Sequence, residues 1–76
     1  MTELKLKAII IKVLGITEGE FSEDKNFIND YAADSLDLTE LIMETENIFG
    51  IIIPDEDVDK LRTYNEVLEY IKSKVA

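Results

Sequence analysis

One stretch decides how this chain folds, DYAADSLDL at residues 30–38, where a loop ends and a helix begins. Asp34 suits the N-cap of that helix, because its carboxylate can accept hydrogen bonds from the free backbone N–H groups of the first turn. Asp37 can bond back as in a capping box, although Glu or Gln is commoner there. Ser35 is then predicted to lie in the first turn with its hydroxyl near solvent. A phosphate ester on Ser35 would meet free N–H groups and the positive end of the helix dipole, worth roughly 0.3–1 kcal/mol at an exposed site.

An Asp-Ser-Leu triplet is weak evidence by itself, because a serine in a first helical turn is usually only structural and short motifs recur. The flanking residues make the match specific. Residues 30–43 resemble the attachment segment of acyl carrier proteins, Asp-Leu-Gly-Ala-Asp-Ser-Leu-Asp followed by an acidic helix that contains Leu and Met. The resemblance extends without gaps over nearly the whole chain, through Phe27, residues 53–56 and residues 70–71.

The resemblance implies a function and a site. In that family the serine carries 4′-phosphopantetheine, which a transferase installs from coenzyme A with a divalent metal, and the prosthetic thiol holds acyl groups as thioesters. Ser35 inherits the attachment role, with Asp34 and Leu36 flanking it in the cofactor-binding segment. The implied function is a carrier that delivers acyl groups to enzymes of fatty acid biosynthesis, or of related lipid or polyketide biosynthesis. The implied partners are a phosphopantetheinyl transferase and acyl-transferring enzymes with basic patches.

The chain departs from the family pattern at three places. Tyr31 and Ala32 replace a Leu-Gly pair, and because Ala tolerates a positive φ less well than Gly, we expect a stiffer loop before the serine. Thr45 occupies a usually apolar inner position, and GII at residues 50–52 replaces a mostly polar stretch. None of these departures lies in the attachment motif. They leave open whether the protein is the housekeeping carrier of fatty acid synthesis or a specialised carrier.

Ser35 is not equipped to act as a nucleophile by itself. The sequence has no His, which removes the usual general base, and no Lys lies near Ser35 in sequence. Asp34 offers only a carboxylate, a weak base at neutral pH. We therefore expect a non-catalytic protein whose serine is activated by another enzyme. The absence of Cys and His also argues against a disulfide framework, and we predict no metal site.

Length and charge set further limits. Seventy-six residues suit one small domain with a limited core, so we predict a single acyl carrier domain over residues 1–76. The net charge of −9 argues against a nucleic-acid partner and suits partners with basic patches. Lysines interrupt the first apolar residues, so no signal peptide is predicted, and no run approaches a membrane span. We expect a cytoplasmic monomer; a mature organellar protein without its presequence would look similar.

Apolar spacing predicts a first helix that follows Thr2 and runs to about residue 14, a second over residues 35–49 and a last one from residue 64 onward, with a short helical turn within residues 55–60. Thr2 is the expected cap of the first helix, and Gly15 and Gly50 are expected to end the first two. Thr63 and Glu66 form a capping box for the last. The stripes expected to face the core are Leu6, Ile9, Ile10 and Val13 in the first helix, and Tyr64, Val67, Leu68, Ile71 and Val75 in the last.

The loops are expected to pack onto these helices. Residues 17–34 form a long connection that Ile16, Phe21, Phe27 and Ile28 can pin to the core. The III run at residues 51–53 resembles a short strand, but no second strand is evident, so we interpret it as a loop that plugs the core. The predicted fold is all-α, a small bundle of three main helices and one short helix, which is also the architecture of the family.

The helix at residues 35–49 has two distinct faces. Its core face comprises Leu38, Leu41, Ile42, Thr45 and Phe49, and its outer face comprises Leu36, Glu40, Met43 and Asn47, with Asp37 and Glu44 alongside. Scattered exposed apolar residues need no explanation. The family supplies another interpretation, a contact surface for partner enzymes formed by Asp37, Glu40, Met43 and Glu44.

The distribution of charge supports that second interpretation. No Lys or Arg occurs between Lys25 and Lys60, an interval that holds ten of the seventeen acidic residues. A charge run is usually only a solvated face. This one surrounds the serine, and concentrated negative charge can steer cationic partners.

Two other functions remain open at the level of sequence. A carrier of aminoacyl or D-alanyl groups would share the serine and the bundle, although the acidic helix favours the acyl carrier. An unmodified protein-interaction subunit would share only the fold. For an acyl carrier, a chain folded between the second and last helices would gain about 0.8 kcal/mol per buried CH₂, and Thr45 is expected to limit that gain.

Overall fold

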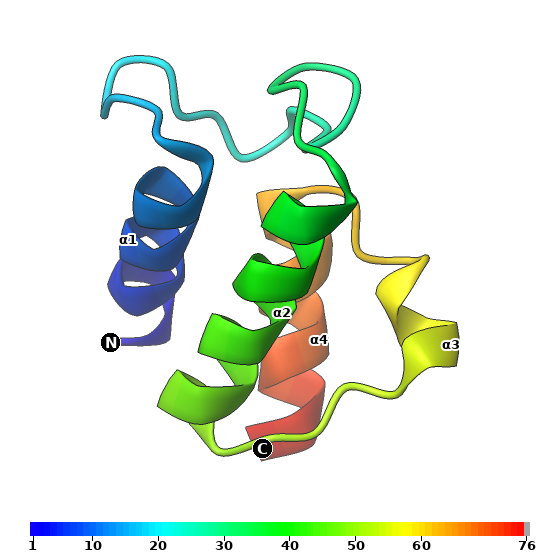
Figure 1. Ribbon diagram of the computed structural model, residues 1–76. Helices are drawn as coiled ribbons and strands as arrows, with labels where there is room; N and C mark the ends of the chain where they lie inside the picture. Colours follow the sequence, from blue (N-terminus) through cyan, green and yellow to red (C-terminus); the bar gives the residue numbers. More distant parts are fainter. Residues whose placement is uncertain (76) are drawn as a thin grey trace.

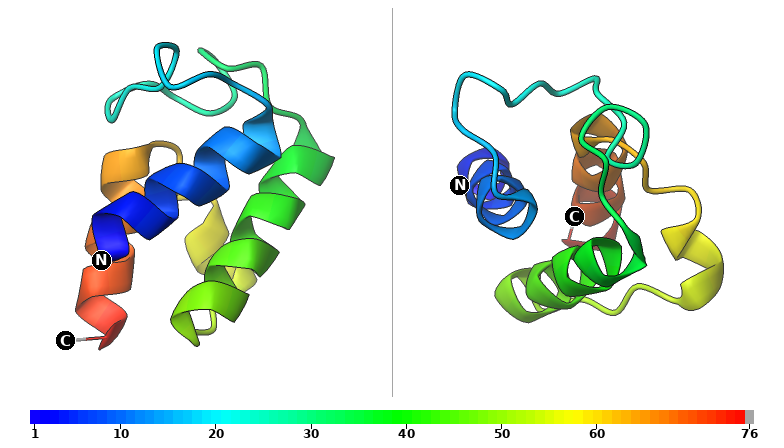
Figure 2. Two further views of the ribbon diagram at one scale, coloured as in Figure 1. Left: turned by 90° about the vertical axis from the view of Figure 1, so that its left-hand side faces the viewer. Right: turned by 45° about the horizontal axis from the view of Figure 1, so that its top comes forward.

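The computed structural model describes residues 1–75, and within them it confirms the all-α prediction (Figure 1). Its four helices are α1 (Thr2–Leu14), α2 (Ser35–Phe49), α3 (Asp55–Val58) and α4 (Tyr64–Val75). The three long helices form the bundle, in which α1 packs against both α2 and α4. The short α3 lies to one side, connected at either end to α2 and α4 (Figure 2).

The core draws on all three long helices and on the loops. Its buried apolar residues are Leu6, Ile9, Ile10, Phe27, Ala33, Leu41, Ile53, Leu61, Tyr64, Val67 and Ile71. Among the predicted inner residues of α1 and α4, Val13 and Leu68 are half-buried and pack against this core. The prediction is wrong at Val75, which is 54% exposed because it is the last residue of α4, beyond the packed part of the helix.

The helix ends follow the sequence signals with one exception. Gly15 and Gly50 adopt left-handed backbone with φ of 66° and 65°, the conformation that glycine accepts most easily after a helix. Thr63 and Glu66 bond reciprocally as a capping box. The prediction that Thr2 caps α1 is wrong. Met1 occupies the N-cap without a side-chain hydrogen bond, because Thr2 is already helical and its side chain cannot take the N-cap place.

The long loop between α1 and α2 is held by hydrogen bonds of its own. The Tyr31 hydroxyl oxygen accepts from the backbone N–H of Ser22 at 2.7 Å and lies 3.2 Å from the carbonyl oxygen of Glu20, to which it can donate. The Phe27 N–H donates to the carbonyl oxygen of Arg62 at 2.8 Å, and the Phe27 side chain is only 1% exposed. The predicted pinning of this loop by apolar residues is therefore confirmed at Phe27, and Ile16 and Phe21 also pack against the core while partly buried. It is wrong at Ile28, which is 37% exposed.

The apolar run before α3 plugs the core with one side chain only. Ile53 is 5% exposed, whereas Ile52 is 81% exposed and Ile51 is half-buried. The residue before a proline favours extended backbone, and successive side chains of an extended segment point to opposite sides. Ile53 therefore enters the core and Ile52 lies in solvent.

Candidate functional site

Ser35 lies at the start of α2, held there by the predicted capping box. The carboxylate Oδ1 of Asp34 accepts from the backbone N–H of Asp37 at 2.9 Å, and Oδ2 of Asp37 accepts from the N–H of Asp34 at 3.2 Å. Ser35 is the first residue of the helix and is exposed. Its hydroxyl is thus accessible at the helix end where the dipole favours a negative group.

The turn before this helix keeps a conformation that usually requires glycine. Ala32 has φ of 58°, and among residues 1–75 it is the only residue other than glycine with a positive φ. A stiffer loop was expected here because alanine accepts this conformation less readily than glycine, and the backbone adopts the conformation nevertheless. The Ala32 N–H donates to the carbonyl oxygen of Ile28 at 3.1 Å and the Ala33 N–H donates to that of Phe27 at 2.9 Å, and these bonds fix the turn.

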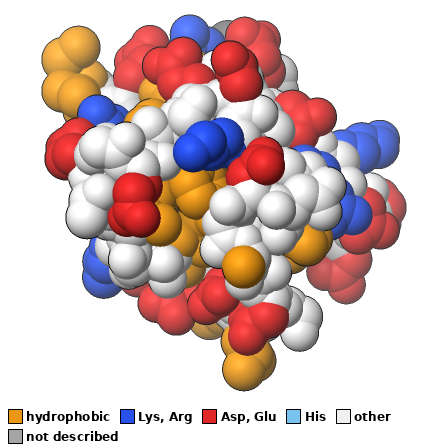
Figure 3. Space-filling model, turned by 90° about the horizontal axis from the view of Figure 1, so that it is seen from above, with side chains coloured by type: hydrophobic (Ala, Val, Ile, Leu, Met, Phe, Trp, Pro, Cys, Tyr) orange, Lys and Arg blue, Asp and Glu red, His pale blue; other side chains and the backbone are white. Residues whose placement is uncertain are grey.

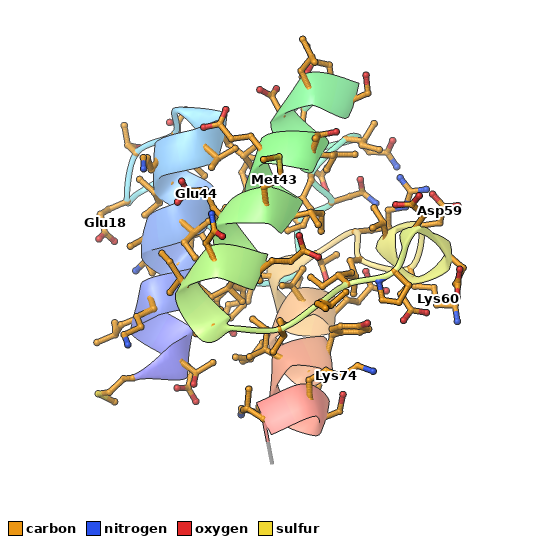
Figure 4. All side chains as sticks on the ribbon, turned by 60° about the horizontal axis from the view of Figure 1, so that its bottom comes forward. Glu18, Met43, Glu44, Asp59, Lys60 and Lys74 are labelled. Atoms are coloured by element: carbon orange, nitrogen blue, oxygen red, sulfur yellow. The ribbon has the colours of Figure 1, made fainter. Side chains whose placement is uncertain are left out.

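A groove of about 560 Å³ begins at Ser35 and follows α2. Its lining residues are Ser35, Leu38, Thr39, Ile42, Met43, Glu46, Ile53, Asp55, Val58 and Asp59. Figure 4 shows Met43 on α2 and Asp59 after α3, on opposite sides of it. Sequence alone predicted a chain-sheltering space between α2 and α4. The groove of the structure instead lies between α2 and residues 53–59.

Thr45, expected to limit that space, does not line the groove. Its side chain is fully buried in the core, and its hydroxyl donates to the carbonyl oxygen of Leu41, one turn earlier, at 2.8 Å. A short polar side chain can be satisfied in this way inside a helix. Thr45 is therefore a core residue and not part of the site.

The side of the groove opposite α2, here called its second wall, is formed by residues 53–59. Within this wall the helix α3 has four residues, none of them buried. It is tied to α4 by the Tyr70 hydroxyl, which donates to Oδ2 of Asp57 at 2.8 Å. Loss of hydration, and then the bond to the Asp57 carboxylate, raise the pKa of Tyr70 to about 12. This hydrogen bond joins α4 to α3, so the position of the second wall depends on it.

The residues of the predicted partner surface do not all face the same way in the structure. Leu36 is 77% exposed and Glu40 is also exposed, so both face solvent next to the serine. Met43 is 57% exposed but also lines the groove. Glu44 turns toward α1, where its Oε1 lies 3.7 Å from Nζ of Lys12. Asp37 is half-buried because it serves the cap.

Sequence analysis missed Glu46 and the acidic residues of the second wall, Asp55 and Asp59. The periodicity of α2 contained the signal for Glu46, since it continues the stripe from Ser35 at helical spacing. Nothing local in the sequence indicated where α3 would pack.

Acidic side chains are spread over the face of the molecule that the long loop covers. Viewed from that side, they occupy much of the outline, with apolar side chains and some Lys and Arg side chains between them (Figure 3). Residues 1–75 contain no group of three or more His, Cys, Asp or Glu that could hold a metal ion. No helix in the same part of the chain is long and apolar enough to cross a membrane.

Comparison with known proteins identifies the family. The family model described as the phosphopantetheine attachment site matches residues 4–71, which is most of the chain. The chain belongs to the acyl carrier family. This carrier is also similar to a solution structure provisionally described as an acyl carrier protein from Anaplasma phagocytophilum. The two chains are 32% identical, the match covers 97% of this chain and 88% of the other, and the TM-score is 0.89.

Membership establishes the kind of group that this carrier holds. Its cofactor is covalently bound 4′-phosphopantetheine, and the predicted helix-bundle architecture of the family is confirmed. Carrier domains of this family are generally non-catalytic. An exposed hydroxyl at a capped helix N-terminus, with an open groove beside it, fits a phosphate-linked arm.

Proposed function

We propose that this carrier holds acyl groups as thioesters on a 4′-phosphopantetheine arm attached to Ser35. It delivers them to enzymes of fatty acid biosynthesis or of related lipid or polyketide biosynthesis. The observation that carries the proposal is the exposed Ser35 hydroxyl at the capped start of α2 and at the mouth of the groove. The proposal treats residues 1–76 as a single carrier domain that acts as a cytoplasmic monomer.

Each residue of the site has a distinct task. Ser35 supplies the hydroxyl to which the arm is joined, and Asp34 and Asp37 hold that residue at the helix N-terminus through the reciprocal cap. The arm, when present, supplies a thiol that forms the thioester. The chain contains no His to take the serine proton, so the proton passes to a base of the phosphopantetheinyl transferase.

The lining of the groove favours the acyl proposal. Its apolar residues are Leu38, Ile42, Ile53 and Val58. Each methylene buried against such a surface contributes about 0.8 kcal/mol. A thioester chain placed there would be shielded from water, which also protects it from hydrolysis.

Partners are expected to contact the exposed side of α2. Leu36 offers an apolar contact beside the attachment serine, and Glu40 and Met43 continue the same side of the helix. Enzymes with Lys and Arg around a shallow apolar hollow match this surface, and the transferase is the first of them.

An intact-mass measurement tests the assignment. Incubation with coenzyme A, Mg²⁺ and a phosphopantetheinyl transferase should add one phosphopantetheine to the parent and none to Ser35→Ala. Ser73→Ala is the matched control, because Ser73 is an exposed serine on α4, and it should gain the same mass as the parent. Circular dichroism should show both variants folded. A mass gain on Ser35→Ala would refute the assignment.

A second candidate, an aminoacyl carrier, has one observation in its favour. Three of the groove-lining residues, Glu46, Asp55 and Asp59, are acidic and would attract an ammonium group. Loading the arm with alanyl and with butanoyl groups separates the two functions. The acyl proposal expects greater thermal stabilisation by butanoyl, and the reverse order would favour the aminoacyl carrier.

A further inference from the structure

The groove has a defined far end. The residues of α2 that line it fall on one stripe from Ser35 to Glu46. With a helical rise of about 1.5 Å per residue, this stripe is roughly 16 Å long. Beyond it α2 ends at Phe49 and is capped by Gly50, and the chain then runs along the lower end of the bundle to α3 (Figure 1).

Glu46 joins the two sides at that end. Its Oε2 accepts from the backbone N–H of Ile53 at 2.8 Å, in a part-buried bond between α2 and the segment before α3. Its own carbonyl oxygen accepts from the N–H of Gly50 at 2.9 Å and from that of Ile51 at 3.3 Å. The side chain is therefore held against the loop and does not extend freely into solvent.

This arrangement opposes the passage of an apolar chain. The groove-lining residues before Glu46 include Leu38 and Ile42, which a methylene chain can cover favourably. To continue past Glu46, the chain would have to displace a carboxylate and leave the Ile53 N–H without its acceptor. Covering an ionised carboxylate with hydrocarbon, or stranding a part-buried donor, is unfavourable.

We propose that Glu46 determines the longest acyl chain that this carrier shelters, an inference that rests on the proposed function. The carboxylate and its bond to Ile53 form a polar stop at the end of an apolar groove. The side chain acts on the cargo by contact and by closing the groove, with no part in attachment at the other end of the stripe.

The test is a chain-length series. Straight acyl groups of even length, from butanoyl to tetradecanoyl, are transferred with their arm from the acyl-coenzyme A, loading is verified by intact mass, and the melting temperature is measured. The melting temperature of the parent should rise with length and then level off. In Glu46→Ala it should level off about two carbons later, because the truncation removes two carbons and the carboxylate oxygens from the end wall.

Two variants serve as controls. Glu46→Gln keeps the length of the side chain and an oxygen that can accept from Ile53, so it should level off with the parent. Glu69→Ala removes an exposed carboxylate from α4, outside the groove lining, and should also match the parent. If Glu46→Ala gives no cooperative melt, Glu46→Asp replaces it, since the shorter side chain does not reach the same acceptor position.

The outcomes separate the two proposals. No mass gain on the parent would refute the proposed function itself. A verified mass gain with the same levelling length in the parent and in the truncated variant would refute only the role of Glu46. The role of Glu46 would also be refuted if the melting temperature of the parent did not depend on acyl length. The same holds if the levelling length shifted equally in Glu46→Gln and in Glu46→Ala.

Discussion

Ala32 is the residue at which the backbone before the attachment serine is strained. A left-handed conformation costs an alanine roughly 1–2 kcal/mol, and the bonds around Ile28 and Phe27 impose it. Ala32→Gly should relieve this strain but lose about 0.5–1 kcal/mol through the greater freedom of the unfolded chain. We expect a net gain of about 0.5–1 kcal/mol in the free energy of unfolding, measured by denaturant titration.

The neighbouring alanine provides the matched control. Ala33 is 7% exposed and has no positive φ, so Ala33→Gly removes a packed methyl group and adds freedom to the unfolded chain. We expect it to lower the free energy of unfolding by about 1 kcal/mol. If both variants are destabilised equally, the strain assigned to Ala32 is absent.

Individual residues also show what the sequence could predict. Asp34, Asp37 and Gly50 act through bonds to residues within a few positions, and their roles were predictable from local chemistry. Thr45 was correctly placed on the inner face, but not its relation to the cargo, since that depends on where α3 packs. The left-handed backbone of Ala32 was not predictable from its residue type, because the hydrogen bonds of the whole turn outweigh the preference of one residue.

Among the elements, α3 depends most on a single tie. It has no buried residue, and the Tyr70 hydroxyl bonds it to α4 through Asp57. Tyr70→Phe should speed hydrogen exchange at the amides of Asp57 and Val58, which bond to the carbonyl of Pro54. Tyr64→Phe is the control. It removes a bond from the Tyr64 hydroxyl to Glu3 on α1, so it should leave exchange in α3 unchanged.

The same bond predicts a pH dependence. Because the pKa of folded Tyr70 is raised above its ordinary value of 10.0 to about 12, the neutral phenol stabilises the fold fully below pH 10. That contribution is lost as the pH rises through about 12. Burial also raises the pKa of Tyr64, so the parent loses stability in this range from both groups. Tyr70→Phe should lose less between pH 10 and 12, and an unchanged pH profile would contradict the tie.

The order of the elements was largely predictable, but the groove was not. The bounds of α1 and α2 follow from apolar stripes with glycines after them, because a helix is specified by neighbours in sequence. The groove arises where α2 faces residues 53–59, and those two segments are joined by tertiary contacts. The hydrogen bond between Glu46 and Ile53 joins residues seven positions apart, and no periodic pattern in the sequence predicts it.

At the scale of the whole molecule, the net charge of −9 is unevenly distributed, and its concentration around α2 affects association. A field of one sign speeds the encounter with an oppositely charged partner and is screened by salt. The structure distinguishes two carboxylates that the sequence treated alike. Glu40 is exposed to solvent, whereas Glu44 lies 3.7 Å from the Lys12 ammonium, which offsets its charge.

This difference gives the last prediction. Glu40→Lys should slow association with the phosphopantetheinyl transferase several-fold at low salt and weaken its salt dependence, because the field at the docking surface is reduced. Glu44→Lys should slow association less, and it should lose up to about 1 kcal/mol of stability with the ion pair to Lys12. Stopped-flow binding at two salt concentrations, with melting curves for each variant, measures both effects. Equal slowing by the two variants would show that total charge governs the encounter and that the position of Glu40 on α2 does not.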